Sequence, residues 1–309
     1  MKKLINLVII LLFILFISGC EKNDYKSKYS IISTSFPGYD FARAVTKDSE
    51  FNVEMLLKPG SEIHDFEPTP QDIIKIKNSD IFIYVGGESD EWIKDILKDI
   101  NGKTKIIKLM DLVETYEEEH VEGMEDEDHD DEEIEYDEHV WTSPTNAITM
   151  IEKIKEEIVK IDSDNKDLYE KNLNNYVLEL SKIDAEIKNI VENSKRKEII
   201  FGDRFPLRYF TEAYGLTYYA AFPGCSEATE ASAKTISFLI KKVKSDKIPV
   251  VFKIELSNGK IANTIAKEAN AKVLEFHSAH NITKDDFTSG LTYIDIMRNN
   301  IKSLSEALN

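Results

Sequence analysis

Cysteine is scarce in this sequence, with two among 309 residues, Cys20 and Cys225. Cys20 closes an N-terminal segment with the features of a secretory signal, because two lysines precede a short apolar run and the small residues Ser18 and Gly19 follow it. Cleavage before Cys20 would leave Cys225 alone in the exported chain. We therefore expect no internal disulfide, and we expect Cys225 to be a small packing residue.

The N-terminal apolar run, Leu4–Ile17, is too short to cross a membrane. It has about 14 residues, against the roughly 20 that a spanning helix needs. Ile17-Ser18-Gly19-Cys20 resembles a bacterial lipobox, in which the cysteine receives a lipid and becomes the mature N-terminus. We expect a signal peptide over residues 1–19, a lipid anchor on Cys20 and a polar tether over residues 20–28, hence an extracytoplasmic protein held at the cell membrane; an uncleaved anchor is the alternative.

Basic residues are outnumbered, 39 to 57, and the net charge of −18 argues against a nucleic-acid partner. The acidic excess lies in one segment. Residues 114–138 contain 16 Asp and Glu and no Lys or Arg, which leaves the rest of the chain at −2. Because like charges this dense repel one another, we expect this acidic insertion to be disordered without bound cations. Its histidines, His120 and His129, suit weak cation capture rather than a formed site.

Common catalytic motifs are absent too: we find no nucleophile elbow, no phosphate-binding loop and no His-Glu-x-x-His sequence. The chain is instead long enough for two domains of about 100–150 residues each. We expect a protein that is not an enzyme.

Short β-type runs alternate with helical segments in both halves of the chain, which predicts parallel βαβ units. The expected strands lie near residues 31–35, 51–57, 80–85 and 105–109, then 198–202, 218–222, 250–254 and 272–276. Between the two series, Thr145 to about Asn193 is helical, with a break near Asp162-Ser163-Asp164. The second of these helices is too long for one small domain, so we expect it to bridge two.

The sequence therefore predicts an α/β fold of two lobes with mostly parallel sheets, joined by a single long helix. We place the N-terminal lobe at residues 29–162, the linking helix at 163–195 and the C-terminal lobe at 196–309. The two lobes have similar architecture but no sequence repeat.

Two histidines, His64 and His139, lie in proline-containing loops just before helices. Ligands of open α/β sheets bind in crevices that such loops build, and prolines hold an imidazole in place at little cost in entropy. A lone loop histidine is nevertheless more often a surface or core residue than a ligand. Spacing alone does not establish a metal site here, since no short His-x-x-x-His motif is present.

The loop from Pro59 to Pro70 is similar to the first metal-ligand loop of the zinc/manganese ABC-transporter substrate-binding lipoproteins (the cluster A-I family, zinc-uptake type). Further stretches resemble motifs of this family in the expected order, and the match runs from residue 29 over nearly the whole chain. They are Thr34-Ser35-Phe36-Pro37, Tyr84-Val85-Gly86-Gly87 with Trp92, His139-Val140-Trp141-Thr142-Ser143-Pro144 and Tyr209–Leu216. The resemblance implies two pseudo-symmetric lobes joined by one long rigid helix, in agreement with the helix expected above.

The resemblance also implies a metal between the lobes, bound by two side chains from each. It carries His64 and His139 over directly. For the C-terminal pair, His277 directly follows a strand and is the preferred choice, with His280 as a second candidate. Zinc-type members usually have a histidine shortly before the Tyr-Phe pair, and this sequence has none there; Asp203 is the nearby oxygen donor, with a helix N-cap or an arginine salt bridge as alternative roles.

Three imidazoles and one carboxylate suit tetrahedral Zn²⁺, whereas Mn²⁺ sites are richer in oxygen. We therefore expect zinc, with manganese as the alternative. Glu255 resembles a position near the cleft, as a ligand or as support for one, and Cys225 is a remote candidate as thiolate ligand.

The function implied is capture of zinc and its delivery to an ABC permease by a lipid-anchored monomer. Two alternatives of other classes are an exported metallohydrolase, with Glu255 as the base, and a surface adhesin.

Overall fold

The computed structural model describes residues 27–62, 66–100, 102–124, 135–224 and 230–309. The predicted signal peptide, the lipid site Cys20, His64, His129 and Cys225 lie outside these ranges. Among the described residues, no helix combines the length and the apolar character that crossing a bilayer requires.

The N-terminal half is built on a four-stranded sheet in which every pair of neighbours is parallel, in the order β2-β1-β3-β4. Ile31, Phe82 and Ile83 are buried in its central strands, as the apolar runs predict. The strands are β1 (Tyr29–Ser33), β2 (Phe51–Met55), β3 (Ile81–Tyr84) and β4 (Lys105–Lys108). The helices of this half are α2 (Phe36–Val45), α3 (Pro70–Asn78) and α4 (Ile93–Lys98).

The C-terminal half repeats this arrangement, with a parallel sheet in the order β6-β5-β7-β8. In both sheets the first strand lies between the second and the third, and the fourth is at the edge. The strands are β5 (Glu198–Arg204), β6 (Thr217–Phe222), β7 (Val250–Lys253) and β8 (Lys272–Glu275). The helices are α7 (Arg208–Tyr214), α8 (Ala233–Ser245), α9 (Lys260–Ala269), α10 (Lys284–Ser289) and α11 (Tyr293–Leu308). The predicted α/β fold with two parallel sheets is confirmed.

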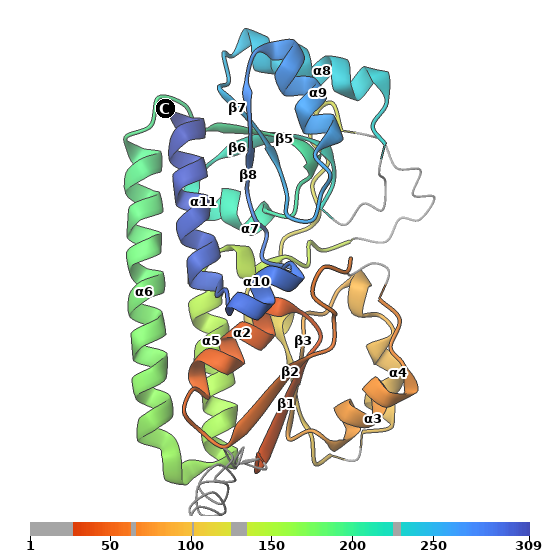
Figure 1. Ribbon diagram of the computed structural model, residues 1–309, viewed down its shortest axis with the longest axis vertical. Coiled ribbons are helices and arrows are strands. Elements are labelled where there is room, and N and C mark those ends of the chain that lie inside the picture. The colour runs from red at the N-terminus through yellow and green to blue at the C-terminus, as the bar shows by residue number, and fades with distance from the viewer. Residues whose placement is uncertain (1–26, 63–65, 101, 125–134, 225–229) are drawn as a thin grey trace, which may run out of the picture.

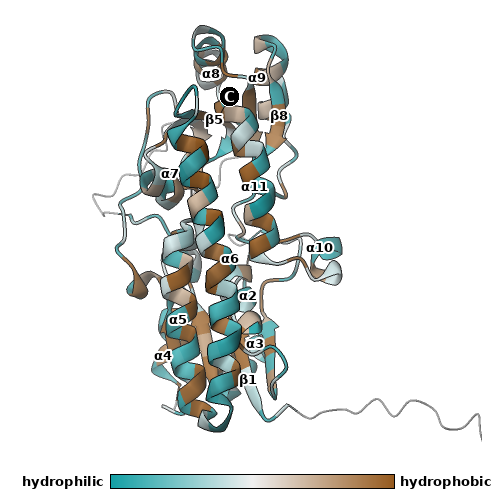
Figure 2. Ribbon diagram, turned by 90° about the vertical axis from the view of Figure 1, so that its left-hand side faces the viewer, coloured by the Kyte–Doolittle hydropathy of each residue, from teal (hydrophilic) through white to brown (hydrophobic). Residues whose placement is uncertain are grey.

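A long helix, α6 (Lys166–Glu192), runs beside both halves and joins them (Figure 1). It follows α5 (Pro144–Ile161) after a 3₁₀ turn at Ser163–Asn165, at the predicted break. The break is stabilised by Asp162, whose carboxylate accepts hydrogen bonds from Tyr169 Oη at 2.6 Å and Asn165 Nδ2 at 2.8 Å. The helix buries one apolar face, made by Tyr169, Leu173, Leu180, Ile183, Ile187 and Val191. Figure 2 shows these apolar residues as brown segments that alternate with teal polar ones along α6.

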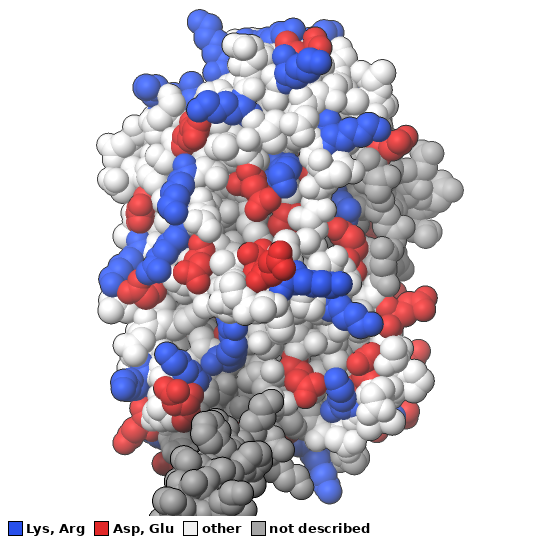
Figure 3. All heavy atoms as spheres, viewed as in Figure 1, with Lys and Arg blue, Asp and Glu red and all other residues white. Residues whose placement is uncertain are grey.

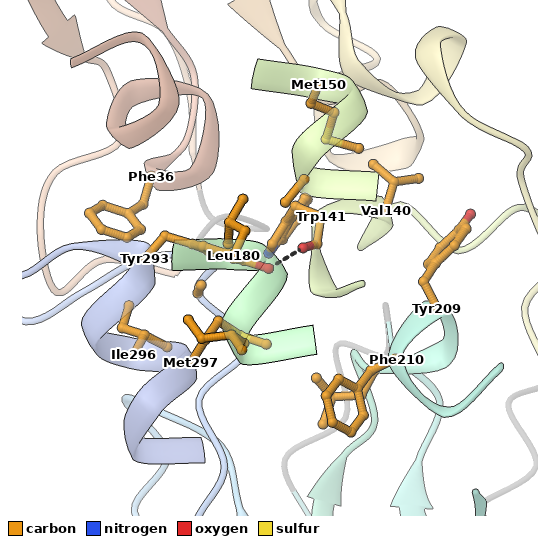
Figure 4. Packing of buried hydrophobic residues seen from close by; sticks show 14 of the residues in the cluster. Phe36, Val140, Trp141, Met150, Leu180, Tyr209, Phe210, Tyr293, Ile296 and Met297 are labelled. Carbon is orange, nitrogen blue, oxygen red and sulfur yellow. Dashed lines mark hydrogen bonds between the residues drawn. The ribbon is translucent and has the colours of Figure 1, made fainter. Parts of the chain in front are cut away.

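The largest hydrophobic cluster is shared by the two halves, and each half also has a smaller cluster of its own, around Phe82 in the N-terminal half and around Val251 in the C-terminal half. A single cluster of buried side chains extends from Phe41 in α2, through α5 and α6, to Phe252 in β7 and Leu304 in α11. Figure 4 shows the middle of this cluster, where Tyr293 and Trp141 meet. Tyr293 Oη donates a hydrogen bond to the Trp141 carbonyl at 2.7 Å. The halves are therefore packed against each other and not merely tethered by the helix.

Parts of the acidic insertion are ordered, so the prediction of disorder is wrong for residues 114–124 and 135–138. Glu119 forms an ion pair with Arg208 and accepts a hydrogen bond from the Tyr218 hydroxyl, both at 3.1 Å. Both partners belong to the C-terminal half. Glu118 N donates to the Glu135 carbonyl, and Met124 is buried. The charge argument overlooked these local anchors. Elsewhere, on the face in Figure 3, basic and acidic side chains are interspersed, as the near-neutral charge of the rest of the chain predicts.

Candidate metal centre

A cavity of about 40 Å³ lies at the boundary between the two halves, large enough for a single ion or water. The N-terminal half contributes Ser61, Glu62 and His139 to its described lining. The C-terminal half contributes Arg204, Pro206, Gly224, Ile254, Glu255, Leu256, Ser278, His280 and Asn281. Most of these residues follow the carboxyl ends of strands, where ligands of open α/β sheets bind.

His139 is almost fully buried, 1% exposed, at the start of the 3₁₀ turn Val140–Thr142. Its backbone N–H donates to Asp137 Oδ1 at 2.8 Å, and the same oxygen lies 3.2 Å from its Nδ1. Because a carboxylate accepts, Nδ1 carries the ring proton and Nε2 keeps its lone pair for a metal. Burial alone would lower the pKa of His139, but the charge and hydrogen bond of Asp137 outweigh it and raise the pKa above its ordinary value.

His280 reaches the same place from the loop after β8. Its ring lies 5.2 Å from that of His139, centre to centre, and 4.9 Å from that of Trp141. Ligand atoms of Glu138, His139 and His280 all lie within 4.8 Å of one another. Two imidazoles and a carboxylate that converge in this way match the donors that Zn²⁺ prefers.

Glu138 is the member of this group that the sequence analysis missed, although it directly precedes His139. It is buried, which raises its pKa to about 7, and it accepts hydrogen bonds from the backbone N–H and the hydroxyl of Ser89. Gly87 makes room for it: a Cβ there would lie 2.7 Å from Glu138 Oε2, and the backbone has a φ of +85°. The space at Gly87 and the two bonds from Ser89 thus set the position of Glu138.

The chain is similar to known proteins both in sequence and in structure. The family model described as zinc-uptake complex component A, periplasmic, matches residues 31–307. The chain belongs to this family. It is 31% identical to the high-affinity zinc uptake system protein ZnuA of Bacillus subtilis, over 99% of this chain and 98% of that protein. It is 32% identical to the zinc-binding lipoprotein AdcA of Streptococcus pneumoniae, over 99% of this chain but only 61% of AdcA.

The solved structures include a close match to this fold. The Zn(II)-bound ZnuA-like domain of Streptococcus pneumoniae AdcA superposes with a TM-score of 0.74 and 28% identity, over 91% of this chain and 99% of the other. The family resemblance predicted from the sequence motifs is thereby confirmed, and so is the expected architecture of two lobes joined by a long helix.

His277, which the sequence analysis preferred, lies outside the group formed by Glu138, His139 and His280. Its Nδ1 accepts a hydrogen bond from Ala279 N at 2.9 Å. Its backbone makes two hydrogen bonds with the side chain of Asn300. The His277 N–H donates to Asn300 Oδ1 at 2.9 Å, and the His277 carbonyl accepts from Asn300 Nδ2 at 2.8 Å. The structure therefore brings His280, not His277, next to His139.

Glu255 lines the cavity and also holds the His280 loop. Its carboxylate accepts hydrogen bonds from the backbone N–H and the hydroxyl of Ser278, and from His280 N at 3.3 Å. In this arrangement Glu255 therefore holds the loop that carries His280.

Asp203 is buried in the lining of a neighbouring cavity of about 220 Å³, which also contains Arg204 and Glu255. Its Oδ1 accepts from Arg204 N at 3.0 Å, and burial raises its pKa. The arginines considered as its partners pair elsewhere: Arg204 Nη1 lies 3.6 Å from Glu62, and Arg208 pairs with Glu119 and Glu212. Asp203 is thus adjacent to the group of His139 and His280 but not part of it.

Proposed function

We propose that this chain captures Zn²⁺ in the cavity between its two halves and delivers it to an ABC permease. The observation that carries the proposal is the pair His139 and His280, which come from opposite halves and lie 5.2 Å apart at the lining of one cavity. The zinc-uptake relatives support the same conclusion.

The donor set favours zinc over manganese, because imidazole suits Zn²⁺ and Mn²⁺ prefers an oxygen-rich shell. We assign His139 and His280 as ligands, and His64 as a third on the strength of its motif. Glu138 is the carboxylate that converges with the two described imidazoles, and Asp203, Glu255 and His277 are the alternatives for the remaining position. Asp137 orients His139 in the manner usual for metal-bound histidines.

The proposed activity is binding and delivery, without turnover. A lipid on Cys20 would keep the protein beside its permease, and the short apolar run that ends in Ser18-Gly19-Cys20 supports this anchor. Cys20→Ala should release the protein from the membrane fraction or leave an unprocessed precursor; unchanged retention with normal processing would contradict the anchor.

The test of the proposed function is metal analysis of the protein purified without chelators, followed by competitive titration with Zn²⁺ and Mn²⁺. We expect one tight zinc equivalent per chain and weaker binding of manganese. A chain that binds neither ion tightly would contradict the proposal. Tighter binding of manganese than of zinc would make the chain a manganese-binding protein of the same family.

A further inference from the structure

The segment that carries His280 is bonded to the opposite half of the molecule along its length. Trp141 Nε1 donates to the Ser278 carbonyl at 2.8 Å, Phe36 N to the His280 carbonyl at 3.3 Å, and Gly60 N to the Ile282 carbonyl at 2.8 Å. All three donors belong to the N-terminal half. The His280 loop therefore follows a strand of one half and rests on the backbone of the other.

Asn281 lies at the centre of this contact, with 3% of its surface exposed. Its Nδ2 donates to the carbonyls of Lys58, at 2.9 Å, and Ser61, at 2.7 Å. Its Oδ1 accepts from Ile282 N at 2.8 Å. Both amide protons and the amide oxygen are thus engaged, and a side chain in this state has one orientation.

Through these two bonds Asn281 holds the turn Lys58–Ser61 in place. Ser61 N also donates to the Lys58 carbonyl, at 3.0 Å, and Gly60 takes a φ of +82°, which closes the turn. The two carbonyls point to the same side, where one amide group can reach both. The turn leads directly into Ser61 and Glu62, which line the cavity.

We infer that Asn281 is a positioning residue for metal capture. Its amide fixes the N-terminal rim of the cavity to the loop of His280, so this side chain, together with the three backbone-carbonyl contacts above, sets the separation of the two walls. The inference rests on the proposed function. Asn281 itself is assigned no bond to the metal; it acts by keeping the ligands in place before the ion arrives, which slows release of the bound ion.

A buried asparagine could also stabilise the fold and do nothing more, and the chain offers a matched control for that role. Asn172 in α6 donates its Nδ2 to two carbonyls as well, Val45 at 2.9 Å and Lys47 at 2.8 Å. Neither Asn172 nor its two partners lines the cavity. Asn172→Ala removes an equivalent pair of bonds, at a half-buried position, without touching the proposed site.

The experiment measures zinc affinity by chelator competition, zinc release by stopped flow and thermal stability, for the wild type, N281A, N281D and N172A. N281D keeps the size and the oxygen of the side chain but has no protons to donate. We expect N281A and N281D to lose roughly tenfold to a hundredfold in zinc affinity, mainly through faster release. N172A should lose stability and bind zinc as the wild type does.

Two outcomes overturn the inference: N281A and N281D that bind zinc like N172A, or an affinity loss in N172A that equals theirs. If the wild type itself does not bind zinc tightly, the proposed function is wrong, and the role of Asn281 falls with it. If N281A does not fold, N281D decides, and hydrogen exchange of the metal-free proteins adds a second readout. Exchange at Gly60 and Ser61 should rise in N281D and stay unchanged in N172A.

Discussion

The two halves have the same strand order, and in each the segment after the fourth strand crosses to the other half. After β4 the crossing segment contacts Tyr209, Arg208 and Tyr218, and it ends at His139. After β8 it contacts the turn Lys58–Ser61 and Trp141, and it contains His280. Equivalent places in a repeated topology thus supply one histidine each.

The two crossings are secured by different chemistry. The first is held mainly by side chains of the C-terminal half, tyrosine hydroxyls and an arginine, that reach toward an acidic segment. The second is held mainly by backbone groups and one asparagine. The shared topology therefore places both histidines at the boundary between the halves. The residues that anchor each histidine segment, however, are of different kinds in the two halves.

The largest expected effect is on the two histidines themselves. His139→Ala and His280→Ala should each lower zinc affinity by about a hundredfold or more, because each removes an imidazole ligand. His277→Ala tests the alternative ligand and should leave affinity within about threefold, since His277 is not in the group of converging ligand atoms formed by Glu138, His139 and His280. Isothermal titration with a competing chelator measures all three. A strong loss in His277→Ala with little in His280→Ala would reverse the assignment.

Next come the tyrosines that tie the halves together. Tyr209→Phe removes a hydroxyl that donates to the Asp137 carbonyl at 2.7 Å and accepts from Tyr116 N at 3.2 Å. Tyr293→Phe removes only the bond to the Trp141 carbonyl. We expect losses of about 2 and about 1 kcal/mol in the free energy of unfolding, because buried partners are left unpaired. Urea denaturation compares them; equal losses would mean that the second bond of Tyr209 contributes nothing.

A smaller effect is expected at Asp137, which orients His139. Asp137→Asn keeps the shape but not the charge, so zinc affinity should fall by roughly tenfold. Chelator competition measures the change. Asp203→Asn makes the same change at an alternative ligand on the C-terminal side, which lines the neighbouring cavity, and we expect a smaller loss there. An equal loss in both variants would place Asp203 among the ligands.

The smallest effect concerns the ion pair of Arg208 with Glu119, whose side chains are 19% and 43% exposed. Glu119→Gln should cost about 0.5 kcal/mol of stability, and less at high salt, because exposed pairs are weak and screened. Thermal melts at low and high salt measure this. A loss above about 1.5 kcal/mol, unaffected by salt, would show that Glu119 anchors the crossing segment more strongly than its exposure implies.

Most of the fold was predictable because it depends on local patterns. The predicted strand at 105–109 lies within one residue of β4, and the helix break at Asp162 is where the sequence placed it. The short helix α10 was not predicted; it has no buried residue, so no apolar periodicity marks it.

The site was predictable only in part. His139 stood out by its motif, but the choice of His277 rested on its place directly after a strand. The chain turns at Ala279, which has a φ of +63°, unusual for a residue with a side chain. That turn leaves the His277 ring bonded to Ala279 N and brings His280 to the cavity. A left-handed alanine leaves no mark in the sequence, because tertiary contacts impose it.

The shared core has a consequence for how the molecule loses its structure. Two lobes with separate cores would melt independently, whereas side chains packed in one cluster across α5, α6 and α11 couple the halves into one cooperative unit. Calorimetry should then show a single transition. A mutation in either sheet would raise the chance that the whole body opens, and a bound ion at the boundary would be released in the same event.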